Sequence, residues 1–292
     1  MLCNACPFEC LVDRSIQTGR CRATADIEVA QAQLHYWEEP PISGNQGSGT
    51  IFFTHCNLAC KFCQNYDISQ EGYGHKVSAE RLEEIILELQ DRGAHNINLV
   101  TPTQYSLQLI PILEKVKPKL KIPIVWNSNA YEKVETLRRL EDLVDIYLPD
   151  LKYFSDELAR KYSSAPNYFH FATRAITEMK RQTRQNVYDD QGVMKKGLII
   201  RHLVLPGQID DSQKILLWIK QNLGTETQIS LMAQYYPTYR AWELEGMNRR
   251  LRPSEYEAIR QYFIELGFKQ GYCQELSAAS EDFTPDFEGR GV

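Results

Sequence analysis

Three cysteines in the first quarter of the chain stand close enough together to hold one metal centre. Cys56, Cys60 and Cys63 follow the apolar segment 51–54 with the spacing C-x3-C-x2-C. A 4Fe–4S cluster normally takes four thiolates, so a set of three leaves one iron open to another ligand. A structural zinc site closes with four ligands, and His55 would point away from Cys56 in an extended chain. The spacing therefore favours an open iron–sulfur cluster over zinc.

Four further cysteines crowd the N-terminus with the spacing C-x2-C-x3-C-x10-C: Cys3, Cys6, Cys10 and Cys21. Four thiolates complete either a tetrahedral zinc site or a second 4Fe–4S cluster, and the spacing leaves both open. The surrounding residues 1–48 contain too few apolar side chains to fold alone, so a bound metal could also serve only to staple them.

Composition narrows the class of protein. The chain has 292 residues, with 33 Lys and Arg against 38 Asp and Glu, a net charge of −5 that argues against nucleic acid as a partner. No run of 18 apolar residues offers a membrane span, and charged residues occupy 1–30 where a signal peptide would be apolar. We expect a cytoplasmic protein without a disulfide framework, in which the isolated Cys273 is a buried thiol.

The elements that must position these cysteines alternate regularly after residue 50. Residues 1–48 are predicted to form an irregular cysteine-rich lobe, and residues 49–292 a second domain. Apolar runs typical of buried parallel strands lie at 51–54, 97–101, 124–127, 144–150, 197–205 and 228–232. Helical patterns lie near 79–92, 104–116, 131–142, 155–162, 167–183, 211–222 and 254–266. Six β-α units fit either a doubly wound sheet or an incomplete barrel, and both gather chemistry at the carboxyl ends of the strands.

The cysteine triplet, with Phe62 directly before its third member, resembles the signature of the radical S-adenosylmethionine (SAM) enzymes. The resemblance extends along the chain and is strongest to the pyruvate formate-lyase activating enzymes and an activating-enzyme-like branch of them. It rests on segments after successive strands and near the end of the chain, at 98–104, 126–129, 148–152, 200–207, 232–237 and 283–287. It implies an incomplete parallel (β/α)6 barrel with a small N-terminal lobe.

The resemblance also implies roles for residues at the strand ends. In the family, the amino and carboxylate groups of SAM chelate the open iron. Lys152 or Arg201 would pair with the carboxylate of SAM, Asp150 would accept from its ammonium group, and Asn129 would bond the ribose or the amino acid moiety. The same reasoning places further cofactor contacts at Phe62, Asn65, Thr101, Thr103, Asn127 and Gln234.

The activity that this resemblance implies is reductive cleavage of SAM to a 5′-deoxyadenosyl radical that abstracts hydrogen. The electron would come from a donor such as flavodoxin or ferredoxin. The substrate stays open between a glycyl-radical enzyme, another peptide or protein, and a small metabolite. A zinc-stabilised adaptor without catalysis is the alternative from another class of protein.

Overall fold

Six parallel strands form the centre of one open sheet. The structure is a computed structural model and describes residues 2–280 and 285–292. The central strands are β2 (Ser48–Phe53), β4 (Ile97–Val100), β5 (Ile124–Ser128), β6 (Ile146–Pro149), β8 (Met194–Leu203) and β9 (Gln228–Met232). The order across the sheet is β10-β9-β8-β6-β5-β4-β2-β1-β3, with β10 (Gly271–Cys273) parallel to β9. Because these parallel strands follow chain order without the reversal of a doubly wound sheet, the fold is the predicted incomplete barrel.

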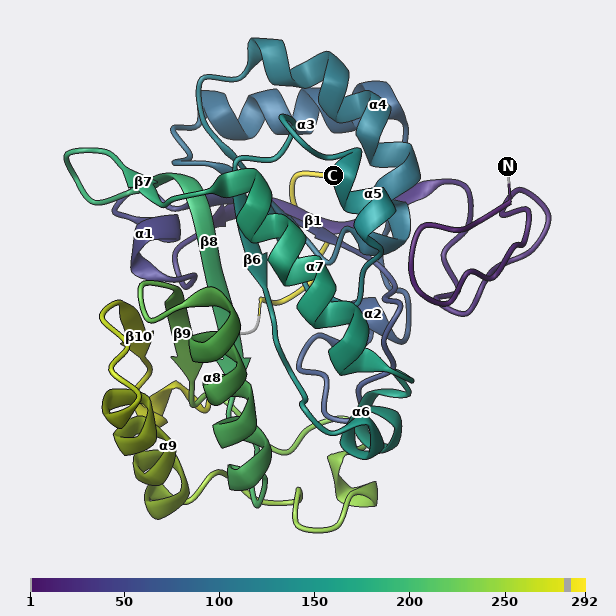
Figure 1. Cartoon of the computed structure of the whole chain (residues 1–292). Coiled ribbons are helices and arrows are strands. Elements are labelled where there is room, and N and C mark those ends of the chain that lie inside the picture. The colour runs from purple at the N-terminus through teal and green to yellow at the C-terminus, as the bar shows by residue number, and fades with distance from the viewer. Residues whose placement is uncertain (1, 281–284) are drawn as a thin grey trace.

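The helices pack outside this sheet, with α7 and α8 in front of β6 and β8 in Figure 1. The long helices are α3 (Ala79–Asp91), α4 (Ser106–Val116), α6 (Asp156–Ser163), α7 (Tyr168–Thr183), α8 (Ile209–Leu223) and α9 (Pro253–Glu265). The helix predicted at 131–142 is wrong in length, since only α5 (Val134–Arg138) forms there. Asn129 accepts a hydrogen bond from the backbone N–H of Tyr131, and Ala130 has a φ of 59°, so these residues make a turn instead.

The segment predicted as an irregular lobe contains a strand. β1 (Ile27–His35) pairs antiparallel with β2 and with the short β3 (His75–Val77), and α1 (Pro40–Ser43) follows it. The irregular interpretation of residues 27–35 is therefore wrong. Their sequence mixes Ala and Gln with few large apolar side chains, so their extended conformation depends on pairing with β2 rather than on a local pattern. The domain boundary at residue 48 stays a prediction.

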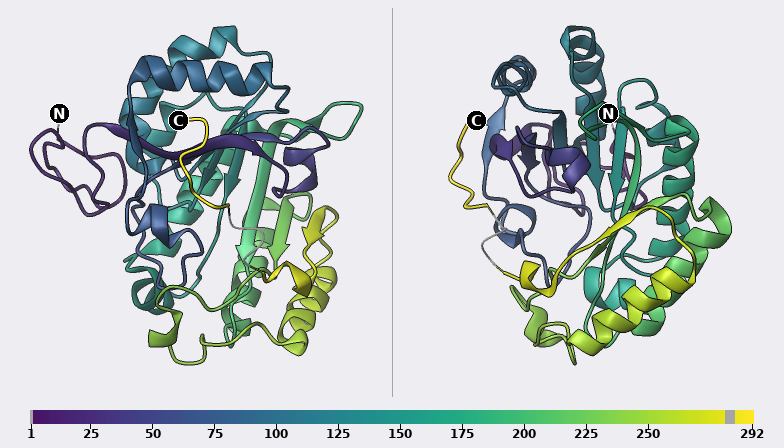
Figure 2. Two further views of the ribbon diagram at one scale, coloured as in Figure 1. Left: turned by 180° about the vertical axis from the view of Figure 1, so that it is seen from behind. Right: turned by 90° about the vertical axis from the view of Figure 1, so that its left-hand side faces the viewer.

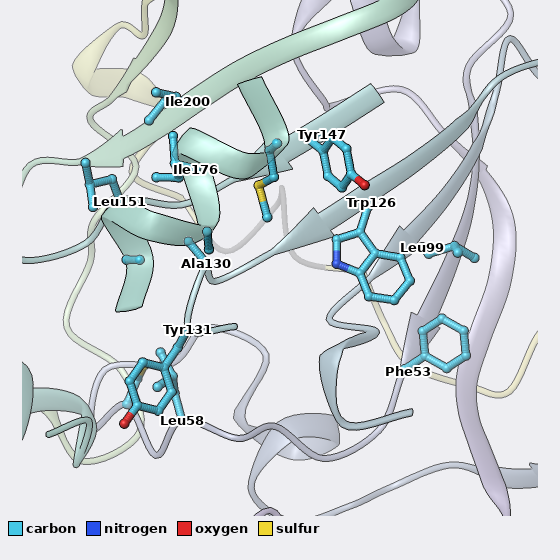
Figure 3. Close-up of a cluster of buried hydrophobic side chains, with 14 of the residues drawn as sticks. Phe53, Leu58, Leu99, Trp126, Ala130, Tyr131, Tyr147, Leu151, Ile176 and Ile200 are labelled. Atoms are coloured by element: carbon cyan, nitrogen blue, oxygen red, sulfur yellow. The ribbon is translucent and has the colours of Figure 1, made fainter. Parts of the chain in front are cut away.

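Alternate residues of the central strands face the helices and build the main core. Leu99, Trp126 and Tyr147 come from three neighbouring strands and are fully buried together with Ile176 of α7 (Figure 3). Neighbouring residues on each strand face the other way, toward the inside of the barrel. This alternation decides which polar side chains can reach the interior.

The inside of the barrel is layered. Val125 and Ile199 pack with Ile42 of α1 in a separate buried cluster, so α1 closes the amino-terminal end of the barrel. Asn127 and Arg201 come two residues after Val125 and Ile199, and therefore stand on the same inner face one layer nearer the carboxyl ends of the strands. Inside the barrel, a layer of polar side chains thus lies between the apolar cluster and the carboxyl ends of the strands.

The C-terminal residues 285–292 return along β1, as the views in Figure 2 show. The N–H of Ala32 donates to the carbonyl of Arg290 at 2.8 Å, and the Phe287 ring packs on Phe52 with centroids 5.4 Å apart. Residues 283 and 284 of the predicted C-terminal motif lie outside the described residues. None of the helices that the structure describes is long and apolar enough to cross a membrane.

Candidate active site at the carboxyl ends of the strands

A cavity of about 420 Å³ lies at the carboxyl ends of the central strands. Most of the residues predicted to form the site line it: Cys60, Phe62, Cys63, Asn65, Asn127, Asp150, Lys152, Arg201 and Gln234. These residues come from β5 and β8 and from the loops after β2, β6 and β9, so the fold brings together positions up to 174 residues apart. Cys56, Thr101, Thr103 and Asn129 are not among the described residues in its wall.

The loop that carries the cysteine triplet is anchored to the next strand. His55 turns the chain sharply with a φ of 63° directly after β2. The side-chain amide of Gln104 donates to the carbonyls of Thr54, at 2.8 Å, and of Thr101, at 2.7 Å. Gln104 stands in the segment predicted to contact SAM, but its amide fixes the backbone of the loop instead.

Each sulfur of the triplet has a polar partner from a different part of the chain. Asn129 Nδ2 donates to Cys56 Sγ at 3.3 Å and Ser163 Oγ to Cys60 Sγ at 2.9 Å, while Ser69 Oγ lies 3.2 Å from Cys63 Sγ. Hydrogen bonds to sulfur are among the interactions that tune an iron–sulfur cluster. Asn129 thus contacts a predicted cluster ligand, although it does not line the cavity.

Burial sets the protonation of these thiols. It raises the pKa of all three, that of Cys63 to about 11, and their mutual repulsion adds to the rise for Cys56 and Cys63. Three thiols, one buried and two half-buried, that have polar partners and lie near a cationic Lys152 are a suitable ligand set for a metal cluster, whose binding would displace the thiol protons. The residues present therefore fit an iron–sulfur cluster with one open iron.

Aromatic packing and amide contacts hold the triplet loop over the barrel. The Phe62 ring contacts those of Tyr162 and Tyr235 edge to face, with centroids 6.4 and 5.6 Å apart. Gln64 Nε2 donates to the carbonyl of Gln234, just past β9, at 2.8 Å. Asn65 follows at the start of α2 (Tyr66–Ser69) and lines the cavity. Phe62 is consequently a packing residue as well as part of the cavity wall.

A network of charged groups crosses the cavity from β8 to β6. Arg201 Nε donates to Asp150 Oδ1 at 2.8 Å, and its Nη2 donates to Asn127 Oδ1 at 2.6 Å. Lys152 Nζ donates to Asp150 Oδ2 at 2.7 Å. Burial alone would raise the pKa of Asp150, but Arg201 and Lys152 outweigh it and hold that pKa below its ordinary value. The strand-end residues predicted from sequence thus form one ionised network.

Glu38 completes this network and was not predicted from the sequence. Its Oε2 lies 3.3 Å from Arg201 Nη1, and its Oε1 accepts from Asn98 Nδ2 at 3.0 Å and from Asn127 Nδ2 at 3.3 Å. Glu38 lies between β1 and α1, in a segment predicted to be an irregular lobe. Only the pairing of β1 with β2, which brings this segment into the barrel, could have revealed it.

Thr103 has a structural partner rather than a place in the cavity. Its Oγ1 donates to Glu132 Oε1 at 3.0 Å, and Glu132 also accepts from Trp126 Nε1 and Ser128 Oγ, each at 2.8 Å. The four side chains form a buried cluster between successive β-α turns. Thr101 has a φ of 56°, and its N–H donates to the carbonyl of Asn127. The predicted SAM contacts of Thr101 and Thr103 stay predictions.

The four N-terminal cysteines lie in a loop that projects to one side (Figure 1). Cys3, Cys6 and Cys21 are buried, and burial raises the pKa of Cys6 to about 12, with Cys21 and Cys3 near enough to raise it further. The side chain of Asn57, the neighbour of Cys56, is near enough to lower the pKa of Cys6 slightly against the effect of burial. Among residues 2–280 and 285–292, no three His, Cys, Asp or Glu side chains are arranged for a single metal ion. The second metal therefore stays a prediction.

Cys273 is exposed, so the prediction of a buried thiol is wrong. It lies on β10, at the edge of the sheet, where one strand neighbour leaves side chains open to solvent. Within the described part of the chain, the residues around the cavity do not include it.

His202 is buried and has a polar partner at each ring nitrogen. Its Nδ1 lies 2.8 Å from the carbonyl of Leu151 and its Nε2 lies 2.9 Å from Ser212 Oγ, so it joins β6 to α8. Burial lowers its pKa to about 4, which makes the folded protein hold a neutral imidazole.

We therefore expect acid to destabilise the protein through His202. Between pH 6.5 and 4 the unfolded chain takes up a proton that the folded chain rejects, so the free energy of unfolding falls as pH falls. Replacement by Gln removes this titration, and the stability of wild type relative to His202→Gln should drop by about 2 kcal/mol from pH 7.5 to pH 5. Urea unfolding at both pH values measures this, with the exposed His170→Gln as control. Parallel stability curves for wild type and His202→Gln would contradict the assignment.

Comparison with known families gives a clear match. Residues 50–219 match the family model described as the radical SAM superfamily. A protein of Methanocaldococcus jannaschii, itself named as uncharacterised, is 34% identical over 265 residues, covering 87% of this chain and 72% of that protein.

Solved structures share the fold at low sequence identity. SuiB of Streptococcus suis bound to S-adenosylmethionine gives a TM-score of 0.52 at 15% identity, over 78% of this chain and 52% of SuiB. Methylornithine synthase gives a TM-score of 0.52 at 15% identity, over 80% of this chain and 74% of that protein. The chain therefore spans about half the length of SuiB, and both likenesses concern the fold alone.

Proposed function

The chain belongs to the radical SAM superfamily, and on that premise we propose that Cys56, Cys60 and Cys63 hold the 4Fe–4S cluster at which SAM is cleaved. The observation that supports this proposal is a set of three thiols in one loop after β2, each with a polar partner, of which Cys60 and Cys63 line the cavity. When bound, the cluster and SAM supply one-electron cleavage of the sulfonium and a 5′-deoxyadenosyl radical for hydrogen abstraction. The chain itself must bind and orient SAM and exclude water.

Lys152 is the best placed residue to meet the carboxylate of SAM. It lines the cavity and lies near Cys60. Burial alone would lower the pKa of Lys152, but the pairing of its ammonium group with Asp150 outweighs this and raises that pKa. An ammonium group has three N–H donors, and the bond to Asp150 uses one of them. Arg201 already bonds with Asp150, Asn127 and Glu38, so it holds the network in place.

The substrate and the partners follow as part of this proposal. Hydrogen abstraction would act on a peptide or protein, including a glycyl-radical enzyme, with a small metabolite as the alternative. Radical SAM enzymes take their electron from an external donor, and we propose a flavodoxin or ferredoxin in that role. We also propose a second metal at Cys3, Cys6, Cys10 and Cys21, as either zinc or a 4Fe–4S cluster.

Anaerobic reconstitution tests the activity. Protein reconstituted with iron and sulfide should be brown and should form 5′-deoxyadenosine from SAM in the presence of dithionite. Omission of dithionite is the matched control, because cleavage needs the electron. Protein that binds zinc alone and forms no 5′-deoxyadenosine would instead support the non-catalytic adaptor.

A further inference from the structure

Glu39 is a buried carboxylate in the cavity wall that lacks a full set of partners. It is 8% exposed and lines the same cavity as Lys152 and Cys60. No polar atom of the described residues pairs with its Oε2, which is itself buried. A buried acceptor without a partner costs about 1–3 kcal/mol, more if it is charged, so such a group needs an explanation.

The usual structural explanations do not apply to this side chain. Glu39 occupies the N-cap position of α1, but its side chain makes no capping hydrogen bond there. No ion pair joins Glu39 to another of the described residues, whereas the adjacent Glu38 bonds with Arg201, Asn98 and Asn127. An ionised carboxylate only accepts hydrogen bonds, so the missing partner of Glu39 Oε2 is a donor.

The charged groups around the cavity also favour a ligand with N–H donors. The buried network around the cavity contains three carboxylates, from Glu38, Glu39 and Asp150, against two cations, from Arg201 and Lys152. Burial raises the pKa of both Glu38 and Glu39, and the attraction of Arg201 opposes that rise. A further cation beside these two carboxyl groups would favour their ionised forms. A ligand with one positive charge and several N–H donors would pair with the unpartnered carboxyl group in the cavity wall.

The ammonium group of SAM does not fit this role as well as a substrate does. Lys152, Asp150 and Arg201 are bonded in succession from the Cys60 side of the cavity toward the Glu38 and Glu39 segment. A SAM molecule bound at the triplet meets Lys152 first. Glu39 stands beyond this row, and the exposed rings of Tyr36 and Trp37 lie beside it in the cavity wall. Aromatic faces attract cations as carboxylates do.

We propose that Glu39 binds a protonated amino group of the substrate, so that the substrate of this enzyme, whether a small molecule or a peptide, carries a free amine. The proposal rests on the radical SAM function, because it takes the cavity as the place where SAM and substrate meet. The carboxylate accepts hydrogen bonds from the ammonium group and orients the carbon chain of the amine toward the triplet. Glu39 is thus a specificity-determining residue that touches substrate and takes no part in electron transfer.

Binding of a simple amine tests this on the reconstituted holoenzyme with SAM. We use n-pentylamine as probe and 1-pentanol as its neutral analogue, and follow the unfolding temperature as each is added. Pentylamine should raise the unfolding temperature of wild type, and pentanol should not. Glu39→Gln should bind pentylamine at least tenfold more weakly, while the exposed outer-face variant Glu114→Gln should behave like wild type. Equal responses of wild type and Glu39→Gln, or no response of wild type to pentylamine, would overturn the proposal.

Two further measurements separate the explanations. Without any probe, Glu39→Gln should unfold at a higher temperature than wild type, because it removes a buried carboxylate without a partner; a lower temperature would show that the carboxylate is needed by the fold. A loss of SAM affinity larger than the loss of amine affinity would assign Glu39 to the cofactor and overturn the proposal. Wild type that fails to cleave SAM with dithionite yet binds pentylamine through Glu39 would refute the radical function and leave the amine site standing.

Discussion

Replacement of Cys60 by Ala is expected to remove the cluster iron and reduce 5′-deoxyadenosine formation to the level of SAM without enzyme. Cys60 is buried and accepts a hydrogen bond from Ser163, and no other thiol of the described residues lines this part of the cavity except Cys63. With only two thiolates left, the triplet cannot hold a cluster that depends on three. Anaerobic iron and sulfide analysis and chromatography of the reaction products measure both effects.

Two matched variants make this result specific. Cys273→Ala removes an exposed thiol at the far edge of the sheet and should retain both iron and activity. Cys10→Ala removes one of the N-terminal set, and should release that metal, as zinc or as iron, while the triplet cluster remains. Full activity of Cys60→Ala would contradict the assignment of the triplet, and equal iron loss in all three variants would indicate misfolding instead.

The sequence predicted those residues of the site that short-range patterns define. The triplet is defined by short spacing, and Asn127, Asp150 and Arg201 each end a buried strand, where a barrel brings side chains together. Glu38 and Glu39 escape this reasoning because they belong to no such strand end. They enter the barrel only because β1 pairs with β2, an interaction between segments that have no shared local pattern.

The predicted helices also differ in how far local sequence signals define them. Ser78 caps α3 by accepting from the N–H of Arg81 and Gly93 follows its end with a φ of 87°, so both signals of the predicted helix 79–92 were present locally. At 131–142 the apolar spacing predicts a helix, but the hydrogen bond of Asn129 to the N–H of Tyr131 holds a turn there. The turn forms in spite of the apolar spacing because the Asn129 side chain accepts the hydrogen bond of a backbone N–H only two residues away.

Removal of the Arg201 side chain should reduce the free energy of unfolding more than the replacement of His202 does. Its guanidinium lies among Asp150, Asn127 and Glu38, and its side chain is 14% exposed. Arg201→Leu leaves the carboxylates of Glu38 and Asp150 buried with Lys152 as the nearby cation, and breaking a buried ion pair on one side typically costs about 3–5 kcal/mol. Urea unfolding should show a loss of this size.

The conservative variant distinguishes charge from shape in the same experiment. Arg201→Lys keeps one positive charge but cannot reach Asp150, Asn127 and Glu38 together, so we expect a smaller loss than for Arg201→Leu. Adding Glu38→Gln to Arg201→Leu should restore part of the stability, since it removes one of the carboxylates left unpaired, and the double-mutant cycle measures this coupling. Equal stability of Arg201→Leu and wild type would show that the network is solvated and contributes little. If the losses of unfolding free energy in the two single variants simply add in the double variant, Glu38 and Arg201 do not interact. Glu38 would then lie inside the barrel for a reason other than pairing with this guanidinium.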